Sequence, residues 1–170
     1  MRVAVNSSPL IFLAKLKLLN ILNELFDEVY ITDAVYHETV VEGAGHEEAI
    51  DIENVDFLKR ASVRNQRVVK FLLEMIDHGE AETIAFALEN EIDLVVLDDK
   101  DARKVARGFG LRVTGTLGLL LLAKRRRLIK EVRPYIKELR KHGFRISESV
   151  LREILEAAGE KSSEKGETAS

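Results

Sequence analysis

Short apolar runs alternate along the chain with longer segments in which apolar residues recur every three or four positions. Four of the short runs have the apolar, β-branched character of strands buried on both faces; they lie at residues 3–5, 29–31, 94–97 and 111–113. Strands that alternate with helices form βαβ units. We therefore expect an α/β fold, a three-layer α/β/α sandwich with a mostly parallel central sheet.

The spacing of apolar residues, together with capping residues, predicts helices between these strands. After a first helix near the N-terminus, they are expected at residues 33–41, around 47–59 (in an uncertain register), 66–77, 80–90 and 99–107. Ser8 and Pro9 suit the start of the first helix, and Asp33 and Asp99 suit helix caps. Gly79 suits the end of the helix before it.

The last third of the chain differs from the rest. Two amphipathic patterns, at about 134–141 and 147–158, predict helices that form an appendage on a single domain spanning residues 1–158. Residues 159–170 contain no large apolar side chain and are rich in Ser, Glu and Lys. This composition is typical of a disordered tail.

Composition narrows the class of protein. Of 170 residues, 46% are hydrophobic and 32% charged, which is typical of a globular protein. The absence of cysteine excludes a disulfide scaffold and a thiolate zinc site. Neither a secretory signal nor an apolar run of membrane-spanning length is present, so we expect a cytoplasmic protein without membrane contact. A single glutamine among many Lys, Arg and Glu resembles the bias of heat-adapted proteins.

The net charge of −3 conceals a strong segregation of charge. Residues 21–99 contain 20 acidic and 5 basic side chains, whereas residues 100–145 contain 15 basic and 3 acidic ones. Such asymmetry is found in proteins that contact nucleic acid, although solvated helix faces produce the same counts.

Polar and acidic side chains follow the predicted strands, at the edge where parallel sheets bind ligands. They are Asn6, Ser7 and Ser8 after the first strand, Asp98, Asp99 and Asp101 after the 94–97 run, and Thr114 and Thr116 after the last. Glu38 lies just over one turn inside its helix, and Glu80 and Glu82 lie in the first turn of theirs.

Carboxylates that gather at one point repel each other unless a cation compensates them. Oxygen ligands without histidine or cysteine suit Mg²⁺ or Mn²⁺, and such a site activates water for attack on a phosphodiester. Taken singly, each acid has a structural explanation as well. Asp99 suits a helix cap, and Glu80 and Glu82 suit the positive end of a helix dipole.

Five segments, in this order and spacing, resemble the PIN-domain nucleases, and most closely the small prokaryotic branch related to VapC-type toxins. They are NSSPLI at 6–11, ITDAVYHE at 31–38, GEAETIA at 79–85, LDDKDAR at 97–103 and TGTLG at 114–118. The resemblance covers about residues 3–158. It implies an α/β/α sandwich, often a homodimer, that cleaves RNA with Mg²⁺ or Mn²⁺ and is blocked by a small antitoxin protein.

The resemblance also implies roles for individual residues. The acidic positions that catalyse and hold the metal match Glu38, Glu80 or Glu82, and Asp99, with Asp98 and Asp101 as helpers through water. Polar positions that face the site match Ser8 and Thr116. Asn6 stands where the family usually has its first aspartate. Its amide oxygen can coordinate a metal but brings no charge, so the resemblance implies weaker metal affinity here.

The basic segment then gains a function as a contact for nucleic acid. Lys100, Arg103, Lys104 and Arg107 share the predicted 99–107 helix and can hold phosphates that flank the scissile bond. Arg103 can equally pair with a neighbouring acid and orient it. The run KRRR at 124–127 belongs to the same basic segment, but such a run is more often a solvated helix end.

Two functions stay open. The first is a metal-dependent ribonuclease, the toxin of a toxin–antitoxin pair, whose products carry 5′-phosphate and 3′-hydroxyl ends. The second is a catalytically weak or inactive PIN-like module that binds RNA or protein, and Asn6 is its main support. A phosphotransfer fold needs an aspartate directly after the first strand, where Asn6 stands.

Overall fold

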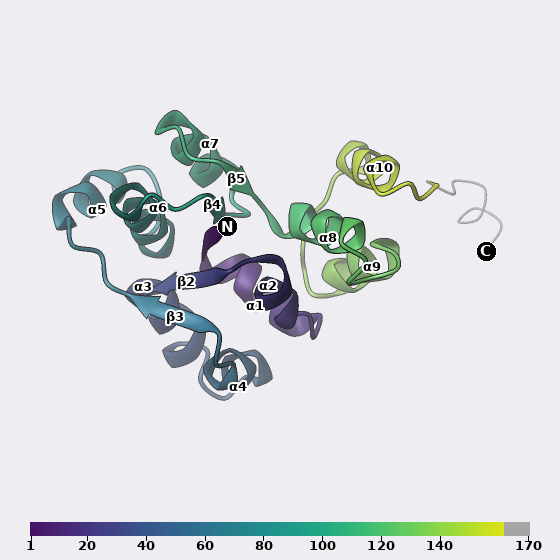
Figure 1. The fold of residues 1–170 in the computed structure, drawn as a ribbon, viewed down its shortest axis with the longest axis horizontal. Helices are drawn as coiled ribbons and strands as arrows, with labels where there is room; N and C mark the ends of the chain where they lie inside the picture. The colour runs from purple at the N-terminus through teal and green to yellow at the C-terminus, as the bar shows by residue number, and fades with distance from the viewer. Residues whose placement is uncertain (162–170) are drawn as a thin grey trace. The chain divides into compact units, whose positions relative to one another are not determined.

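The computed structural model describes residues 1–161. Within them, five strands form one sheet in the order β3-β2-β1-β4-β5, and every neighbouring pair is parallel (Figure 1). The strands are β1 (Arg2–Val5), β2 (Glu28–Thr32), β3 (Leu58–Ala61), β4 (Leu94–Val96) and β5 (Val113–Thr114). The predicted α/β fold with a parallel sheet is confirmed.

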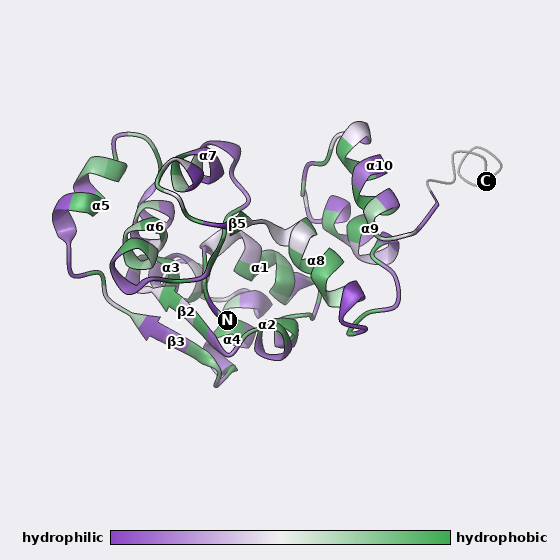
Figure 2. Ribbon diagram, turned by 45° about the horizontal axis from the view of Figure 1, so that its top comes forward, coloured by the Kyte–Doolittle hydropathy of each residue, from purple (hydrophilic) through white to green (hydrophobic). Residues whose placement is uncertain are grey.

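Helices connect the strands and follow the last one. They are α1 (Ser7–Lys15), α2 (Asn20–Leu25), α3 (Asp33–Tyr36), α4 (Glu47–Asn54), α5 (Gln66–Leu72), α6 (His78–Asn90), α7 (Lys100–Gly108), α8 (Thr116–Arg125), α9 (Arg133–Lys141) and α10 (Glu148–Ala157). A π-helical turn, η1 (His37–Val41), continues directly from α3. Figure 2 shows α7 as largely hydrophilic, whereas α9 and α10 alternate between hydrophobic and hydrophilic residues, in agreement with the two predicted amphipathic helices.

The strand order explains the layers of the sandwich. From β1 the chain moves to β2 and β3 on one side, then crosses back to β4 and β5 on the other. Because such crossovers are right-handed, α1, α2 and α4 cover one face and α5, α6 and α7 the other. The contacts agree, since α1 packs on α4 and α6 packs on β1, β2 and β4. The reversal between β1 and β4 creates a switch point, where ligands bind at the carboxyl ends of strands.

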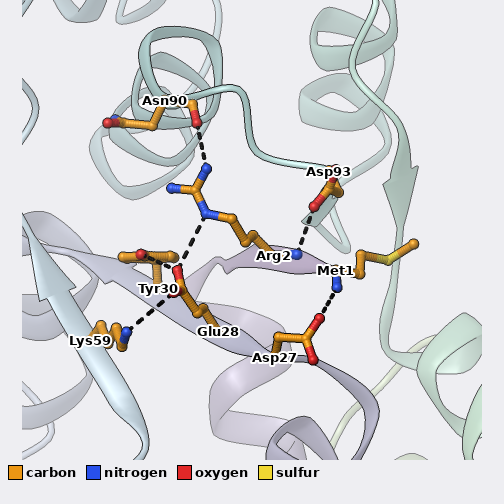
Figure 3. Close-up of polar contacts among 8 residues, drawn as sticks. All are labelled: Met1, Arg2, Asp27, Glu28, Tyr30, Lys59, Asn90 and Asp93. Atoms are coloured by element: carbon orange, nitrogen blue, oxygen red, sulfur yellow. Dashed lines mark hydrogen bonds and ion pairs between the residues drawn. The ribbon is translucent and has the colours of Figure 1, made fainter.

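Polar contacts close the opposite, amino edge of the sheet (Figure 3). The Arg2 guanidinium donates to Glu28 Oε2 at 3.3 Å and to the Asn90 carbonyl oxygen at 2.9 Å, and its backbone N–H donates to Asp93. Lys59 forms an ion pair with Glu28 on the other side, at 3.5 Å. These charged groups thus have partners at the edge remote from the switch point.

Contacts between residues divide the chain into two units, Met1–Thr116 and a second that begins at Leu117. The first holds the whole sheet. The second contains α9 and α10, which bury Ile136, Leu139 and Leu155. A single domain over residues 1–158 stays a prediction. No helix among residues 1–161 is long and apolar enough to cross a membrane.

The segment with an uncertain register contains a strand that the sequence pattern did not reveal. The helix expected around 47–59 ends at Asn54, and β3 pairs with β2 from Leu58 onward. Because β3 is an edge strand with exposed Lys59 and Arg60, it lacks the apolar run of a buried strand. The prediction of helix through this stretch is wrong.

Several predicted helix boundaries are also wrong. Thr32, not Asp33, caps α3, because its hydroxyl accepts from Val35 N–H at 3.4 Å. Asp33 instead forms an ion pair with Arg60 at 2.7 Å. The 66–77 helix stops at Leu72, and Gly79 lies inside the first turn of α6 rather than ending its predecessor.

Glu160, at the start of the predicted tail, has well-defined partners in the structure. The Glu160 carboxylate accepts hydrogen bonds from Val132 N–H at 2.8 Å, Arg133 N–H at 3.1 Å and Lys124 Nζ at 2.9 Å. A disordered tail from Gly159 is therefore wrong for Glu160, because this side chain fills a place at the start of α9. Residues 162–170 lie outside the described residues.

Candidate functional site

Asn6 stands at the switch point, one residue beyond β1. Its backbone N–H donates to the Val96 carbonyl oxygen at 3.1 Å, which extends the β1–β4 pairing by one bond. Asn6 is also the N-cap residue of α1, where the sequence predicted Ser8. An N-cap side chain normally accepts a hydrogen bond from the first turn, but that of Asn6 does not.

The Asn6 amide is buried without a partner for its oxygen. The residue is 4% exposed, and Oδ1 is the one buried side-chain polar atom among residues 1–161 that has no hydrogen bond. Leaving such an acceptor unpaired costs about 1–3 kcal/mol. A buried polar atom of this kind marks a place where a ligand can bind.

Glu38 projects from the π-helical turn η1 to the same place. Its Oε1 accepts a hydrogen bond from Ser7 Oγ at 2.5 Å, so α1 and η1 orient this carboxylate together. Burial raises the pKa of Glu38 above its usual range, and the Ser7 hydrogen bond opposes that shift. The negative charges of Asp77 and Glu42 raise the pKa further.

Gly79 makes room for these two side chains. A β-carbon on residue 79 would overlap Glu38 Oε1, and it would stand 3.0 Å from Glu38 Cδ and 3.1 Å from Asn6 Oδ1. Both oxygens therefore lie against the first turn of α6. The sequence pattern presents Gly79 as a helix stop and as the first residue of the GEAETIA segment, and it does not reveal the contact with Glu38. The signal that could have revealed this role is a glycine directly before Glu80 and Glu82.

Glu80 forms a capping box at the start of α6. The Glu80 N–H donates to Asp77 Oδ1 at 2.9 Å, and Asp77 N–H donates back to Glu80 Oε1 at 3.1 Å. Burial raises the pKa of Glu80 to about 7, and the negative charges of Asp77 and Asp99 add to the effect. Glu80 thus lies in the electrostatic field of Asp99 and tends to hold a proton near neutral pH.

Glu82 faces a different neighbour. Its Oε1 accepts from Ala34 N–H at 2.8 Å, at the start of α3, and its Oε2 lies 3.5 Å from His78 Nε2. Glu82 and Glu38 border one pocket of about 510 Å³, lined by Asp33, Ala34, His37, Glu38, Glu42, Arg60, His78 and Glu82. Positions two apart on a helix point about 200° apart, which separates Glu82 from Glu80. The choice between the two as a ligand stays open.

The three aspartates after β4 have different surroundings. Asp99 is exposed and caps α7, because its Oδ2 accepts from Ala102 N–H at 2.9 Å. Asp98 accepts from Thr116 N–H at 2.7 Å and Thr116 Oγ1 at 2.6 Å, so both of its oxygens are occupied. Burial raises the pKa of Asp98, and the Thr116 bonds oppose the shift. Asp101 is exposed and makes no hydrogen bond or ion pair within the described residues.

The residues predicted to contact nucleic acid fall into two groups. Lys100, Lys104 and Arg107 are exposed on α7 and have no ion pair with any described residue. Arg103 is half-buried, and its Nη1 donates to the Asp98 carbonyl oxygen at 2.5 Å, so it holds the loop of a neighbouring acid.

Ser8 and Thr116 also support Asp98. Ser8 lies near enough to the Asp98 carboxylate to help lower its pKa, and Thr116, which donates to that carboxylate, is fully buried. An RNA contact by the Thr116 hydroxyl would require its bond to Asp98 to break.

The donors at the switch point are chemically suited to a hard cation. Among residues 1–161, no three His, Asp or Glu side chains lie close enough together to hold a metal by themselves. Asparagine is not among these residue types, and the unpartnered Asn6 oxygen is a further possible ligand beside Glu38. Amide and carboxylate oxygens are the ligands that Mg²⁺ and Mn²⁺ prefer. Asn6 and Glu38 are therefore a pair of oxygen donors suited to a hard divalent cation, whereas Glu80 and Asp99 do not form a three-acid cluster with Glu38 in the described part of the chain.

Comparison with known families agrees with this architecture. A family model described as a PIN domain matches residues 2–160, and so spans both units of the chain. No curated protein gives a significant match.

Proposed function

The chain belongs to the PIN-domain family, whose members are generally nucleases that use divalent metals, and from this premise we propose that it is an endoribonuclease. It hydrolyses RNA phosphodiester bonds with Mg²⁺ or Mn²⁺. The observation that carries the proposal is the buried, unpartnered Asn6 Oδ1 beside Glu38, both packed against Gly79 at the switch point of the sheet.

The residues at the switch point have different roles in the proposed hydrolysis. Asn6, Glu38, Glu80 and Asp99 would hold the cation, which when bound supplies charge neutralisation at the phosphate and activation of water. Ser7 fixes the Glu38 carboxylate through its hydrogen bond to Oε1. Without the cation the pKa of Glu80 is about 7, so binding of the cation near neutral pH would displace a proton from this carboxyl. The exposed lysines of α7 bind phosphates that flank the scissile one.

The charge of Asp99 provides the test of catalysis. Asparagine caps a helix as well as aspartate does, so Asp99→Asn keeps the bond to Ala102 N–H and removes only the negative charge. We expect hydrolysis of a structured RNA with Mn²⁺ to slow by about 100-fold or more. Asp56→Asn, the same change at an exposed residue before β3, is the control and should leave the rate unchanged.

Two results would contradict the catalytic proposal. One is an equal rate for the unmodified protein and Asp99→Asn. The other is the absence of products with both proteins when both are folded and Mn²⁺ is present.

A second candidate function is a binding module without catalysis, and Asn6 is the observation that favours it. A neutral amide beside Glu38 compensates less cation charge than a carboxylate does. This function predicts RNA binding that survives both EDTA and Asp99→Asn, with no cleavage products. It also predicts that Asn6→Asp creates Mn²⁺-dependent hydrolysis, whereas a nuclease already active with Asn6 gains affinity for Mn²⁺ rather than a new activity.

We also propose that the protein acts in the cytoplasm as the toxin of a pair of the VapC type, as a homodimer blocked by a small antitoxin. The family membership supports this role, since the resemblance in the five segments is closest to that branch. A short reading frame that overlaps this gene, with a product that stops RNA hydrolysis at a 1:1 ratio, is the expected finding. A product that leaves hydrolysis unchanged would contradict it.

A further inference from the structure

A block of cations lies in the turn after α8, in the second unit. We define this basic turn as Arg125, Arg126, Arg127 and Lys130, all of which are exposed. From residue 102 to residue 130 the chain contains no acidic residue. Glu131 directly follows Lys130, so the sequence places one acid beside the four cations of the basic turn and leaves a local excess of positive charge.

The tertiary structure does not neutralise this excess. Some exposed cations elsewhere pair with acids, as Lys17 does with Asp51 and Lys141 with Glu138. Within the part of the chain that the structure describes, no member of the basic turn forms an ion pair. The turn thus presents uncompensated positive charge to solvent.

The backbone that carries this charge is held at both ends. At the α8 end, Leu128 N–H donates to the Ala123 carbonyl oxygen at 2.8 Å and Arg127 N–H to that of Lys124 at 2.9 Å. At the α9 end, the Glu160 carboxylate accepts hydrogen bonds from Val132 N–H and from the Lys124 ammonium. Lys124 therefore has an acidic partner and is not counted in the basic turn. A fixed turn loses less conformational freedom when its side chains bind a ligand.

Arg127 occupies a backbone conformation that suits glycine. Its φ of 61° lies in the left-handed region, at the end of a helix where glycine is the usual residue. An arginine here costs backbone free energy that glycine would avoid. Lys17 and Glu91 adopt the same conformation, so it assigns no function to the guanidinium by itself, but it makes glycine a substitution that this backbone tolerates.

We propose that the basic turn binds the phosphate backbone of RNA without regard to base sequence. RNA as the polyanion rests on the proposed function. Arginine favours the choice of phosphate, because its planar fork matches phosphate oxygens in a bidentate manner. No aromatic residue lies between residues 110 and 134, so the turn has no neighbouring ring in the sequence for stacking on bases. The turn is a contact additional to the candidate site at the switch point.

Binding of a 20-nucleotide single-stranded RNA to the full chain in EDTA tests the proposal. Arg125→Glu/Arg126→Glu/Arg127→Glu should weaken binding about tenfold or more and lower the salt slope of log Kd by about 2. The matched control is Arg64→Glu/Arg67→Glu/Lys70→Glu, which changes the net charge equally at three exposed cations in α5 and just before it. It should change Kd less than twofold. Equal losses in the two variants, or no loss in the first, would overturn the proposal.

Arg127→Gly separates binding from folding. Because glycine suits the left-handed conformation, the thermal midpoint should stay the same or rise, while RNA binding weakens and the salt slope falls by about 0.7. A lower midpoint with unchanged RNA binding would show a structural role and overturn the proposal. Binding to anionic lipid vesicles but not to RNA would also overturn it.

These measurements use no hydrolysis, so they stand apart from the proposed function. Loss of RNA binding in the basic-turn variant of a protein that cleaves nothing supports the basic turn and contradicts the nuclease. Unchanged RNA binding in the variant of an active nuclease contradicts the basic turn alone.

Discussion

Gly79 brings Asn6 and Glu38 together because it lacks a β-carbon. The space that a side chain would fill is taken by the Glu38 carboxylate and the Asn6 oxygen. Helix formation in α6 does not explain a glycine at this position, because glycine lowers helix stability relative to alanine. The site, rather than the helix, therefore explains this residue.

Gly79→Ala should destabilise the protein by about 1–3 kcal/mol, because the new methyl group forces the Glu38 carboxylate to move. Urea unfolding measures this change, and Mn²⁺ affinity should fall with it. Gly108→Ala is the control, since a β-carbon there meets nothing within 4 Å. It should leave stability equal or higher. Equal effects of the two substitutions would show that packing at residue 79 is not special.

Glu80 gives the stability of the metal-free protein a pH dependence. The folded protein keeps the Glu80 proton up to about pH 7, whereas the unfolded chain loses it near pH 4.5, the ordinary pKa of glutamate. Raising the pH across this window therefore destabilises the fold, by about 3 kcal/mol at most. Glu80→Gln keeps an acceptor for Asp77 N–H and removes the titration.

Urea unfolding in EDTA at pH 4.5–8 measures this effect. The stability of Glu80→Gln relative to the unmodified protein should rise with pH by about 3 kcal/mol at most. Glu74→Gln, at an exposed site, is the control. A difference in folding stability between Glu80→Gln and the unmodified protein that stays constant with pH would contradict the raised pKa of Glu80.

At the scale of elements, the predicted strands and helices agree best with the structure where the residues of an element by themselves decide its conformation. The apolar runs of β1, β2 and β4 are confirmed because their side chains are buried on both faces. β3 was missed because edge pairing with β2 makes Leu58–Ala61 a strand in spite of its charged residues. The start of α9 similarly depends on Glu160, which lies far along the chain.

Glu160→Gln should destabilise the protein by about 2 kcal/mol at neutral pH. Burial opposes its ionisation, but hydrogen bonds from Val132 N–H, Lys124 and Arg133 N–H outweigh burial and lower the pKa of Glu160. The carboxylate therefore stabilises the fold above its unfolded pKa of about 4.5, and this contribution is lost as pH falls through the lower folded value.

Thermal unfolding of Glu160→Gln between pH 3 and 8 measures this contribution. The loss of stability in Glu160→Gln relative to the unmodified protein should be largest at pH 7 and should become smaller toward pH 3. Glu156→Gln, an exposed change on α10, is the control and should cost less than about 0.5 kcal/mol. A deficit that grows as the pH falls would contradict the assigned direction.

For the whole molecule, the segregation of charge follows the division into units only in part. The first unit contains every residue of the candidate site, but it also contains the basic helix α7. The second unit carries the basic turn. A nuclease needs both kinds of charge, acids to hold a cation and bases to hold the phosphate backbone. A net charge of −3 is therefore compatible with a nucleic-acid partner.

The sequence by itself determined the order of most elements and the edge of the sheet at which Asn6 and Asp99 stand. Periodicity and strand ends are local properties, so they can be read from neighbouring residues. Only the tertiary structure decided that the Glu38 carboxylate packs against Gly79, that Thr116 donates a hydrogen bond to Asp98, and that β3 is a strand. Each of these depends on groups distant in sequence, whose approach is decided when the chain packs and its buried polar atoms find partners.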